Sequence, residues 1–312
     1  MTRGLLSIEG LERTEIEAIL SRAKDFQPLQ NQSFARVDTL RGKMIVNLFF
    51  ESSTRTRTSF EIAAKRLGAD AVSITASGSS VSKGESLVDT LNTLAAMRPN
   101  AIVMRHAASG APHFLARHLP IPIINAGDGT HEHPTQALLD ARTILDRRGQ
   151  LEGLRVAIIG DIAHSRVARS NVHLLSKFGV DIVLCGPAPL LPADLARIAP
   201  GVTLTYDIRE AIREADVIMM LRVQLERQHE SAFPAGEYFP FYGLRLEHMA
   251  LAKPDVIVMH PGPINRGREL SSEVADSQRS VILNQVENGI AVRMAVLERI
   301  IGGVNDGGGN NQ

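Results

Sequence analysis

Several features are missing from this sequence, and each absence removes a class of protein. It has a single cysteine, Cys185, so an internal disulfide is impossible. Lys and Arg together number 34, as do Asp and Glu, so the chain lacks the overall basic field of a nucleic-acid-binding protein. It also lacks a signal-peptide pattern and any apolar run of membrane-spanning length. We therefore expect a cytoplasmic protein that binds neither nucleic acid nor membrane.

The length of the chain favours two domains, because 312 residues exceed what one compact core usually holds. Apolar runs typical of buried strands alternate with amphipathic stretches typical of helices. This is the pattern of parallel sheets that are covered on both faces, so the sequence predicts an α/β fold of two doubly wound parallel-sheet domains. The predicted strands are 44–50, 70–74, 101–104, 121–125, 155–159, 181–185, 202–206, 216–221 and 256–259.

The domain boundary is predicted near a helix at about 134–148 and the polar turn that follows it. We place the first domain at 1–140 and the second at 141–285. The last amphipathic stretch is expected to return to the first domain and complete it with a helix at 286–303. The Gly- and Asn-rich residues 304–312 have almost nothing to bury, and we expect them to be disordered.

The strongest functional signal is the run Ser-Thr-Arg-Thr-Arg at 53–57, where the first predicted strand gives way to a helix. Free backbone N–H groups at the start of a helix favour an anion. Ser52 or Ser53 is expected to cap the helix, and Arg55 offers a forked donor that suits phosphate oxygens. A well-capped helix with solvated arginines is the alternative interpretation. The preceding strand and the doubled Thr-Arg pattern favour a phosphate site.

Ligands of open parallel sheets bind beyond the carboxyl ends of the strands, so residues that follow the other strands are further candidates. Arg105 and His106 follow the third predicted strand. The fourth strand leads through a polar segment at 125–136, which ends in His133 and Gln136. We expect these polar groups to converge on one rim of the sheet.

The triplet His131, Glu132 and His133 has side chains that are suitable zinc ligands. No additional ligand is evident nearby, and the helical spacing of a zinc protease motif is absent. We therefore favour a hydrogen-bonding role and predict no metal and no cofactor. His133 also suits helix entry, because Pro134 is favourable at a first helical position. That role explains the proline but not Gln136 one turn later.

In the second half, the strand at 155–159 ends in Gly160 and Asp161, which resembles the first turn of a dinucleotide fold. The spaced glycines that let a pyrophosphate approach the backbone are absent, so nicotinamide binding is disfavoured. The strand ends instead supply Arg166, Arg222 and nearby Gln224. Arginines from separate strands suit a substrate with more than one carboxylate, although a surface salt bridge is the alternative for each of them.

Taken in order, six phrases of the chain resemble the catalytic chains of the aspartate carbamoyltransferase family. They are FFESSTRTRTSFE, MRH, DGTHEHPTQALLD, GDIAHSR, LRVQLER and MHPGPINRG, and the resemblance runs from about residue 5 to residue 301. STRTR with HPTQ is shared with ornithine carbamoyltransferases, whereas RVQ-x-ER and HPGP indicate the aspartate branch. The ornithine enzymes typically carry a cysteine in an HCLP-like motif, where this chain has Gly262.

The resemblance implies transfer of the carbamoyl group of carbamoyl phosphate to L-aspartate, an early step of pyrimidine biosynthesis, in the cleft between the two domains. It implies that Arg55, Thr56, Arg105 and His133 are catalytic. By the same resemblance, carbamoyl phosphate is bound by Ser53, Thr54, Arg55, Thr56, Arg105, His133 and Gln136. L-Aspartate is bound by Arg166, Arg222 and Gln224, with the backbone of Gly262 and Pro263 closing over the reacting centre.

The family also implies partners. The loop equivalent to 79–83 reaches into the site of a neighbouring subunit, so a homotrimer with a shared Lys83 is implied. Without a partner, such a Ser- and Gly-rich segment is typical of a mobile surface loop. Relatives work as bare trimers, with regulatory chains, or with dihydroorotase-like chains. Two other classes remain open, a non-catalytic anion-binding relative and a Rossmann-type oxidoreductase.

Overall fold

The computed structural model describes residues 4–31, 36–75, 87–223 and 235–302. The chain divides into two compact units, one made of residues 1–138 with 287–312 and the other of residues 139–286. Each unit contains a sheet of five strands, and all the strand pairs in both sheets are parallel. The predicted α/β fold with two parallel-sheet domains is confirmed.

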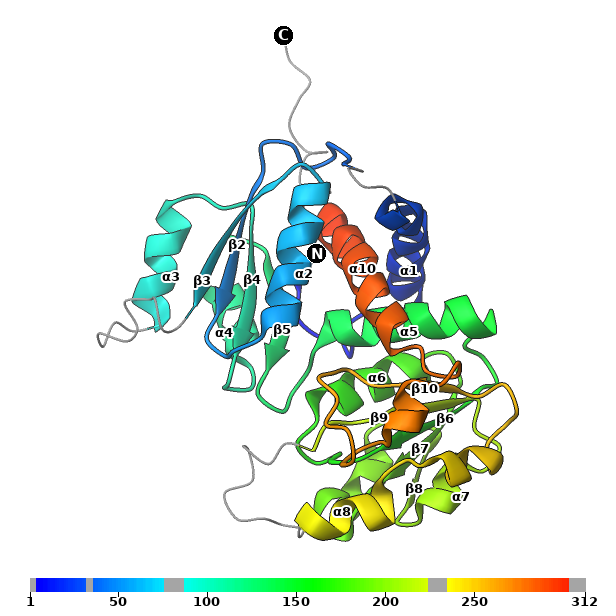
Figure 1. Ribbon diagram of the computed structural model, residues 1–312. Helices are drawn as coiled ribbons and strands as arrows, with labels where there is room; N and C mark the ends of the chain where they lie inside the picture. The colour runs from blue at the N-terminus through cyan, green and yellow to red at the C-terminus, as the bar shows by residue number, and fades with distance from the viewer. Residues whose placement is uncertain (1–3, 32–35, 76–86, 224–234, 303–312) are drawn as a thin grey trace. The chain divides into compact units, whose positions relative to one another are not determined.

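The first unit has the strand order β1-β5-β4-β2-β3. After the short edge strand β1, the chain continues at β2, moves outward to β3 and then crosses to β4 on the other side of β2. Because such crossovers are right-handed, this reversal places α2 on one face and α3 and α4 on the other (Figure 1). The strands are β1 (Gly4–Leu5), β2 (Met44–Phe49), β3 (Asp70–Thr75), β4 (Ala101–His106) and β5 (Ile123–Asp128).

Helices cover the sheet of the first unit, and two of them, α5 and α10, extend across the division into the second unit. The helices are α1 (Arg13–Phe26), η1 (Gln27–Asn31), α2 (Thr54–Arg66), α3 (Leu87–Ala96), α4 (Ala111–His118) and α10 (Ile282–Gly302). Helix α5 (Pro134–Arg148) spans the division, which falls between Leu138 and Leu139. Its bounds agree with the predicted helix, because Pro134 begins it and Gly149 follows its end.

The second unit also contains a parallel sheet in which the strand order reverses, here β10-β9-β6-β7-β8. The chain enters at β6, moves outward through β7 and β8, and then crosses back to β9. The strands are β6 (Arg155–Ile159), β7 (Asp181–Cys185), β8 (Val202–Thr205), β9 (Val217–Met220) and β10 (Ile257–Met259). The helices are α6 (Arg166–Ser176), η4 (Ala188–Leu190), η5 (Ala193–Arg197), α7 (Ile208–Ile212), α8 (Ala235–Tyr242), η7 (Leu246–Ala250) and α9 (Ser272–Ala275).

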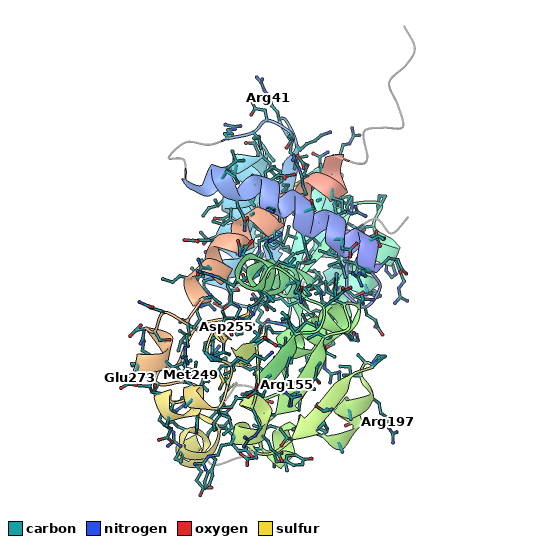
Figure 2. All side chains as sticks on the ribbon, turned by 90° about the vertical axis from the view of Figure 1, so that its right-hand side faces the viewer. Arg41, Arg155, Arg197, Met249, Asp255 and Glu273 are labelled. Atoms are coloured by element: carbon teal, nitrogen blue, oxygen red, sulfur yellow. The ribbon has the colours of Figure 1, made fainter. Side chains whose placement is uncertain are left out.

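The cores form around the central strands, which are mostly apolar, as expected for sheets that are buried on both faces. The edge strand β3 is an exception, because half of its residues are exposed. All residues of β5 and β9 are buried. Cys185 at the end of β7 is also fully buried, and burial raises the pKa of its thiol to about 12. Charged side chains such as Arg41 and Arg197 project outward instead (Figure 2). Within the part of the chain described here, no helix is long and apolar enough to cross a bilayer.

The strand predictions were correct in kind and differ from the structure mainly at strand ends. Strands β6 and β7 occupy the predicted residues. Strand β4 continues to His106, two residues beyond its predicted end, so Arg105 lies within the strand rather than after it. The two-residue strand β1 was not predicted, because so short a run has no period. The tail at 304–312 lies outside the described residues.

Asp216 joins several elements at the amino ends of the second sheet. Its buried carboxylate accepts from the backbone N–H of Arg155 at 2.9 Å, from Arg148 Nη2 at 2.6 Å and from Lys253 Nζ at 2.9 Å. Burial alone raises the pKa of Asp216, but these donors lower it below its usual value. The ionised carboxylate therefore stabilises the junction of β6, β9 and the end of α5.

We expect Asp216→Asn to lower the free energy of unfolding by about 2 kcal/mol at neutral pH, because the buried carboxylate loses its charge-assisted hydrogen bonds to the partly exposed Arg148 and Lys253. A depressed pKa gives stability that is present above the unfolded value near 4 and is lost as the pH falls through the folded value. The difference between the two proteins should therefore shrink in acid. Chemical denaturation measured between neutral and acidic pH checks this.

The matched control is Asp276→Asn, which removes an exposed ion pair with Arg266. Its effect on the denaturation midpoint should be too small to resolve. Equal losses in the two variants, or a loss for Asp216→Asn that does not change with pH, would contradict the assigned role of Asp216.

Candidate active site

The switch of direction between β2 and β4 leaves a crevice at the carboxyl end of the first sheet, where ligands of open α/β sheets bind. Strand β2 ends at Phe49 and α2 begins at Thr54, so the loop between them lies at this crevice. A cavity of about 400 Å³ occurs there. It is lined by Phe49, Phe50, Glu51, Ser52, Ser53, Thr54, Arg57 and Thr75.

Ser53 stands at the N-cap position of α2, but its side chain makes no capping hydrogen bond. The expected side-chain cap is therefore wrong for Ser53, although its carbonyl accepts from the Arg57 N–H at 3.2 Å and starts the helix. The first turn carries Arg55 and no acidic residue. A cation at a helix N-terminus opposes the helix dipole, and a bound anion would reverse that penalty.

Arg105 lies beside this loop because β4 pairs with β2, and its carbonyl accepts from the Phe50 N–H at 2.9 Å. Its Nε is 3.3 Å from a carboxylate oxygen of Glu51, and Nη1 donates to the Ala126 carbonyl at 3.2 Å. The guanidinium is thus held between the exits of β2 and β5. Sequence reasoning missed Glu51, although its place directly after a strand was a usable signal.

His133 and Gln136 lie at the start of α5. The carbonyl of His133 accepts from the backbone N–H groups of Gln136 at 2.9 Å and of Ala137 at 3.3 Å, so His133 forms the entry to the helix. Both side chains are buried, with exposed fractions of 4% for His133 and 8% for Gln136. Helix entry and a binding role are therefore compatible at His133.

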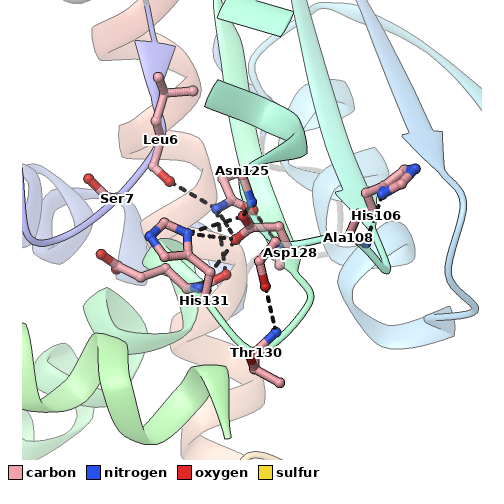
Figure 3. Close-up of polar contacts among 12 residues, drawn as sticks. Leu6, Ser7, His106, Ala108, Asn125, Asp128, Thr130 and His131 are labelled. Atoms are coloured by element: carbon pink, nitrogen blue, oxygen red, sulfur yellow. Dashed lines mark hydrogen bonds and ion pairs between the residues drawn. The ribbon is translucent and has the colours of Figure 1, made fainter. Parts of the chain in front are cut away.

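Asp128 holds the turn that leads to these residues (Figure 3). Its carboxylate accepts from Asn125 Nδ2 at 2.7 Å, from the Gly110 N–H at 2.6 Å and from the Glu132 N–H at 3.2 Å. His131 Nδ1 lies 3.1 Å from Oδ2 of the same carboxylate. Burial raises the pKa of Asp128, but these partners lower it below its usual value, and Asp128 in turn raises the pKa of His131.

The triplet at 131–133 does not act as one set of ligands. The carboxylate of Glu132 accepts from the backbone N–H groups of Ile8 at 2.8 Å and Glu9 at 3.2 Å, so it is used to hold the segment after β1. His131 instead meets Asp128 and His113, whose ligand atoms lie within 4.8 Å of one another. Sequence reasoning missed this grouping because His113 comes from α4, far from the triplet.

In the second sheet the strand order reverses between β6 and β9, and a predicted arginine follows each of these two strands. Arg166 is the first residue of α6, and only 4% of it is exposed. The Ser165 side chain caps this helix by accepting from the Ala168 N–H at 3.1 Å. As at Arg55, a guanidinium in the first turn opposes the helix dipole. Arg222 follows β9 and is half-buried.

Glu269 connects the segment after β9 with the loop after β10. Its fully buried carboxylate accepts from the Val223 N–H at 3.1 Å and from both the backbone and the side chain of Asn265, at 2.9 and 2.8 Å. Burial raises its pKa. In the same loop, the Gly262 N–H donates to His260 Nδ1 at 2.8 Å. Sequence reasoning missed Glu269, because nothing in the pattern distinguishes it from a surface acid.

The structure brings some of the predicted site residues together and leaves others apart. Ser53 and Thr54 line the cavity beside α2. Lys83 and Gln224 lie outside the described residues, as does the loop at 79–83. Among the residues that are described, the lining of the cavity does not include Arg55, Thr56, Arg105, His133 or Gln136.

Comparison with known proteins adds independent information. Two family models match the chain. The carbamoyl-phosphate-binding domain of aspartate and ornithine carbamoyltransferases matches residues 3–146. The Asp/Orn-binding domain of the same enzymes matches residues 152–300. The chain is also 85% identical over 302 residues to an aspartate carbamoyltransferase catalytic subunit from Solibacter usitatus, covering 97% of this chain and 100% of that protein.

Solved structures share the fold. The chain aligns with an ornithine carbamoyltransferase from Pyrococcus furiosus at a TM-score of 0.88 and 31% identity, over 97% of this chain and 98% of the other. It aligns equally well, at 0.88 and 33% identity over 95% of each chain, with the aspartate transcarbamoylase from Trypanosoma cruzi in complex with N-(phosphonacetyl)-L-aspartic acid. Fold similarity therefore does not separate the two branches, whereas the 85% identity to the Solibacter usitatus catalytic subunit indicates the aspartate branch. The chain belongs to the aspartate carbamoyltransferase family.

Proposed function

We propose that this chain transfers the carbamoyl group of carbamoyl phosphate to the amino group of L-aspartate, giving N-carbamoyl-L-aspartate and phosphate, an early step of pyrimidine biosynthesis. The observation that carries this proposal is the 85% identity, along nearly the whole chain, to an aspartate carbamoyltransferase catalytic subunit. The position of the arginines adds physical support, because in each unit they lie at or near the carboxyl ends of strands.

The first unit is proposed to bind carbamoyl phosphate. Ser53, Thr54, Arg55 and Thr56 would hold the phosphate through backbone N–H groups, hydroxyls and a guanidinium at the start of α2. Arg105, His133 and Gln136 would contact the carbamoyl group. The cavity at the start of α2 and the ion pair that holds Arg105 support this assignment.

The second unit is proposed to bind L-aspartate. Arg166 and Arg222 suit its two carboxylates, because each guanidinium offers paired donors. Gln224 completes the set, and the Gly262 and Pro263 backbone would close over the reacting centre. The tie between the β9 and β10 segments through Glu269 supports a joint role for these two segments.

The chemistry requires positioning and electrostatics more than a side-chain base. The aspartate amine attacks the carbamoyl carbon, and negative charge develops on the carbonyl oxygen. Thr56, Arg105 and His133 are proposed to donate hydrogen bonds to that oxygen, with Arg55 neutralising the phosphate. As the tetrahedral intermediate collapses, the leaving phosphate accepts the proton of the amine. No metal or cofactor takes part in this proposal.

We further propose that the enzyme is a cytoplasmic homotrimer in which the Lys83 loop of one subunit completes the site of its neighbour. The family pattern at 79–83 supports this arrangement. Regulatory or dihydroorotase-like chains are proposed partners of the trimer. The functional division at 140/141, with the terminal helix completing the carbamoyl-phosphate domain, is part of the same proposal.

The choice between aspartate and ornithine is the first test. With carbamoyl phosphate and L-aspartate, the purified chain should form carbamoyl aspartate in a colorimetric assay, whereas L-ornithine should give no product. The physical reason is charge, because Arg166 and Arg222 attract a second carboxylate and repel the ornithine ammonium group. Citrulline formation at a comparable rate would overturn the aspartate assignment.

Arg105→Ala tests the oxyanion role. Removing one preorganised donor should lower kcat by about 100- to 1000-fold, or roughly 3 kcal/mol of transition-state stabilisation, while leaving the fold intact. The matched control is Arg41→Ala, an exposed arginine of the same unit, which should keep full activity. Steady-state kinetics with circular dichroism spectra of each variant checks both statements, and near-normal turnover in Arg105→Ala would exclude the role.

Mixed trimers test the shared site. Subunits carrying Lys83→Ala and subunits carrying Arg55→Ala should each be nearly inactive alone. After dissociation and reassembly together, activity should return, because some sites then receive both an intact Lys83 and an intact Arg55. The control is each variant dissociated and reassembled alone. A mixed sample that is no more active than these controls would show that each site belongs to one subunit.

A further inference from the structure

The group of His113, Asp128 and His131, in the first unit, has no part in the proposed reaction. One ligand atom from each residue lies within 4.8 Å of the other two. Asp128 Oδ2 and His131 Nδ1 are 3.1 Å apart. Two ligands of a tetrahedral zinc ion, with bonds of about 2.0 Å, lie roughly 3.3 Å apart. The distance between Asp128 and His131 therefore fits a pair of metal ligands as well as a hydrogen bond, and His113 lies within 4.8 Å of both.

His113 supplies the second, independent observation. Its Nδ1 is buried and has no hydrogen-bond partner among the residues that the structure describes. Its ring meets the ring of His131 edge-on, with the centroids 5.3 Å apart and an angle of 73° between the planes. A buried imidazole nitrogen without a partner costs free energy, and a bound metal ion would remove that cost.

The surroundings of Asp128 suit a ligand carboxylate. Asn125 Nδ2 and the N–H groups of Gly110 and Glu132 fix its orientation, as outer hydrogen bonds do for the ligands of metal ions (Figure 3). His131 is 35% exposed, so solvent reaches the group. Two imidazoles and one carboxylate leave the fourth position of a tetrahedral ion for water.

The second unit contains a useful comparison. Asp161 and His164 have the same spacing in sequence as Asp128 and His131, and His164 Nδ1 lies 2.8 Å from Asp161 Oδ1. Within the described part of the chain, this pair is not joined by a third potential ligand. An Asp-His pair is therefore an ordinary turn contact, and His113 is the feature that makes the first group different.

We propose that His113, Asp128 and His131 bind a divalent transition-metal ion of the zinc class. Imidazole nitrogens favour zinc, cobalt and nickel over magnesium, which prefers oxygen ligands. The bound ion would connect α4 to the turn between β5 and α5. Its ligand His131 lies two residues before His133. The site is separate from the proposed carbamoyl transfer and does not depend on it.

Cobalt titration of the full-length protein, after removal of metals by chelation, tests the proposal. Wild type should bind one equivalent of Co²⁺ with the visible absorption of a four-coordinate ion, and Zn²⁺ but not Mg²⁺ should displace it. His113→Ala and His131→Ala should each weaken Co²⁺ affinity by more than about 100-fold, since loss of a ligand exceeds the cost of losing an outer hydrogen bond. Asp128→Asn is avoided because the carboxylate also holds the turn.

The matched control is His118→Ala, which removes an exposed histidine from the same helix. It should bind Co²⁺ as wild type does, and Zn²⁺ should raise the melting temperature of wild type and His118→Ala but not of His113→Ala. The proposal is overturned if wild type gives no saturable visible spectrum, or if His113→Ala and His131→Ala bind as wild type. It is equally overturned if His118→Ala loses as much affinity as they do.

Discussion

The structure depends on one constraint, which is that the order of strands in each parallel sheet reverses at an inner strand, β2 in the first sheet and β6 in the second. The reversal leaves a crevice beside β2 in one sheet and beside β6 in the other. Both crevices lie at the carboxyl ends of strands, where the N-termini of the following helices present unsatisfied N–H groups. Two anion-binding positions thus follow from the topology before any particular side chain is considered.

The side chains at these positions do not favour the stability of their own helices. Arg55 and Arg166 place cations in the first turns of α2 and α6, where the helix dipole disfavours them, and Arg166 is buried as well. The helix dipole opposes a cation in the first turn and favours an anion there. Both arginines stand at helix N-termini that follow strands of a parallel sheet, which is where anionic ligands bind. Their placement supports a ligand-binding role.

Much of the fold was predictable because its determinants are local. Uniformly apolar runs such as β6 and β7, and a helix that begins at Pro134, carry their signals within a few residues. The contacts that hold the site together were not predictable. Glu51 with Arg105, and Glu269 with Val223, join residues that are distant in sequence.

The histidines show the same limit. The triplet at 131–133 suggested a common role, but the fold sends Glu132 to the segment after β1 and His131 toward Asp128 and His113. The Ser53 cap failed for a related reason, since a favourable residue type does not fix the side-chain hydrogen bond. Residue type and spacing therefore identified the candidate residues, whereas their partners required the three-dimensional structure.

The central claim is that donors at the two crevices bind a phosphorylated carbamoyl donor and a dicarboxylic amine. A crystal structure of the chain with a bisubstrate analogue that carries a phosphonate and two carboxylates tests it most directly. The account predicts the phosphonate at the start of α2, against Ser53 to Thr56, and the carboxylates on Arg166 and Arg222. An analogue bound elsewhere, or a phosphonate that makes no contact with the first turn of α2, would contradict it.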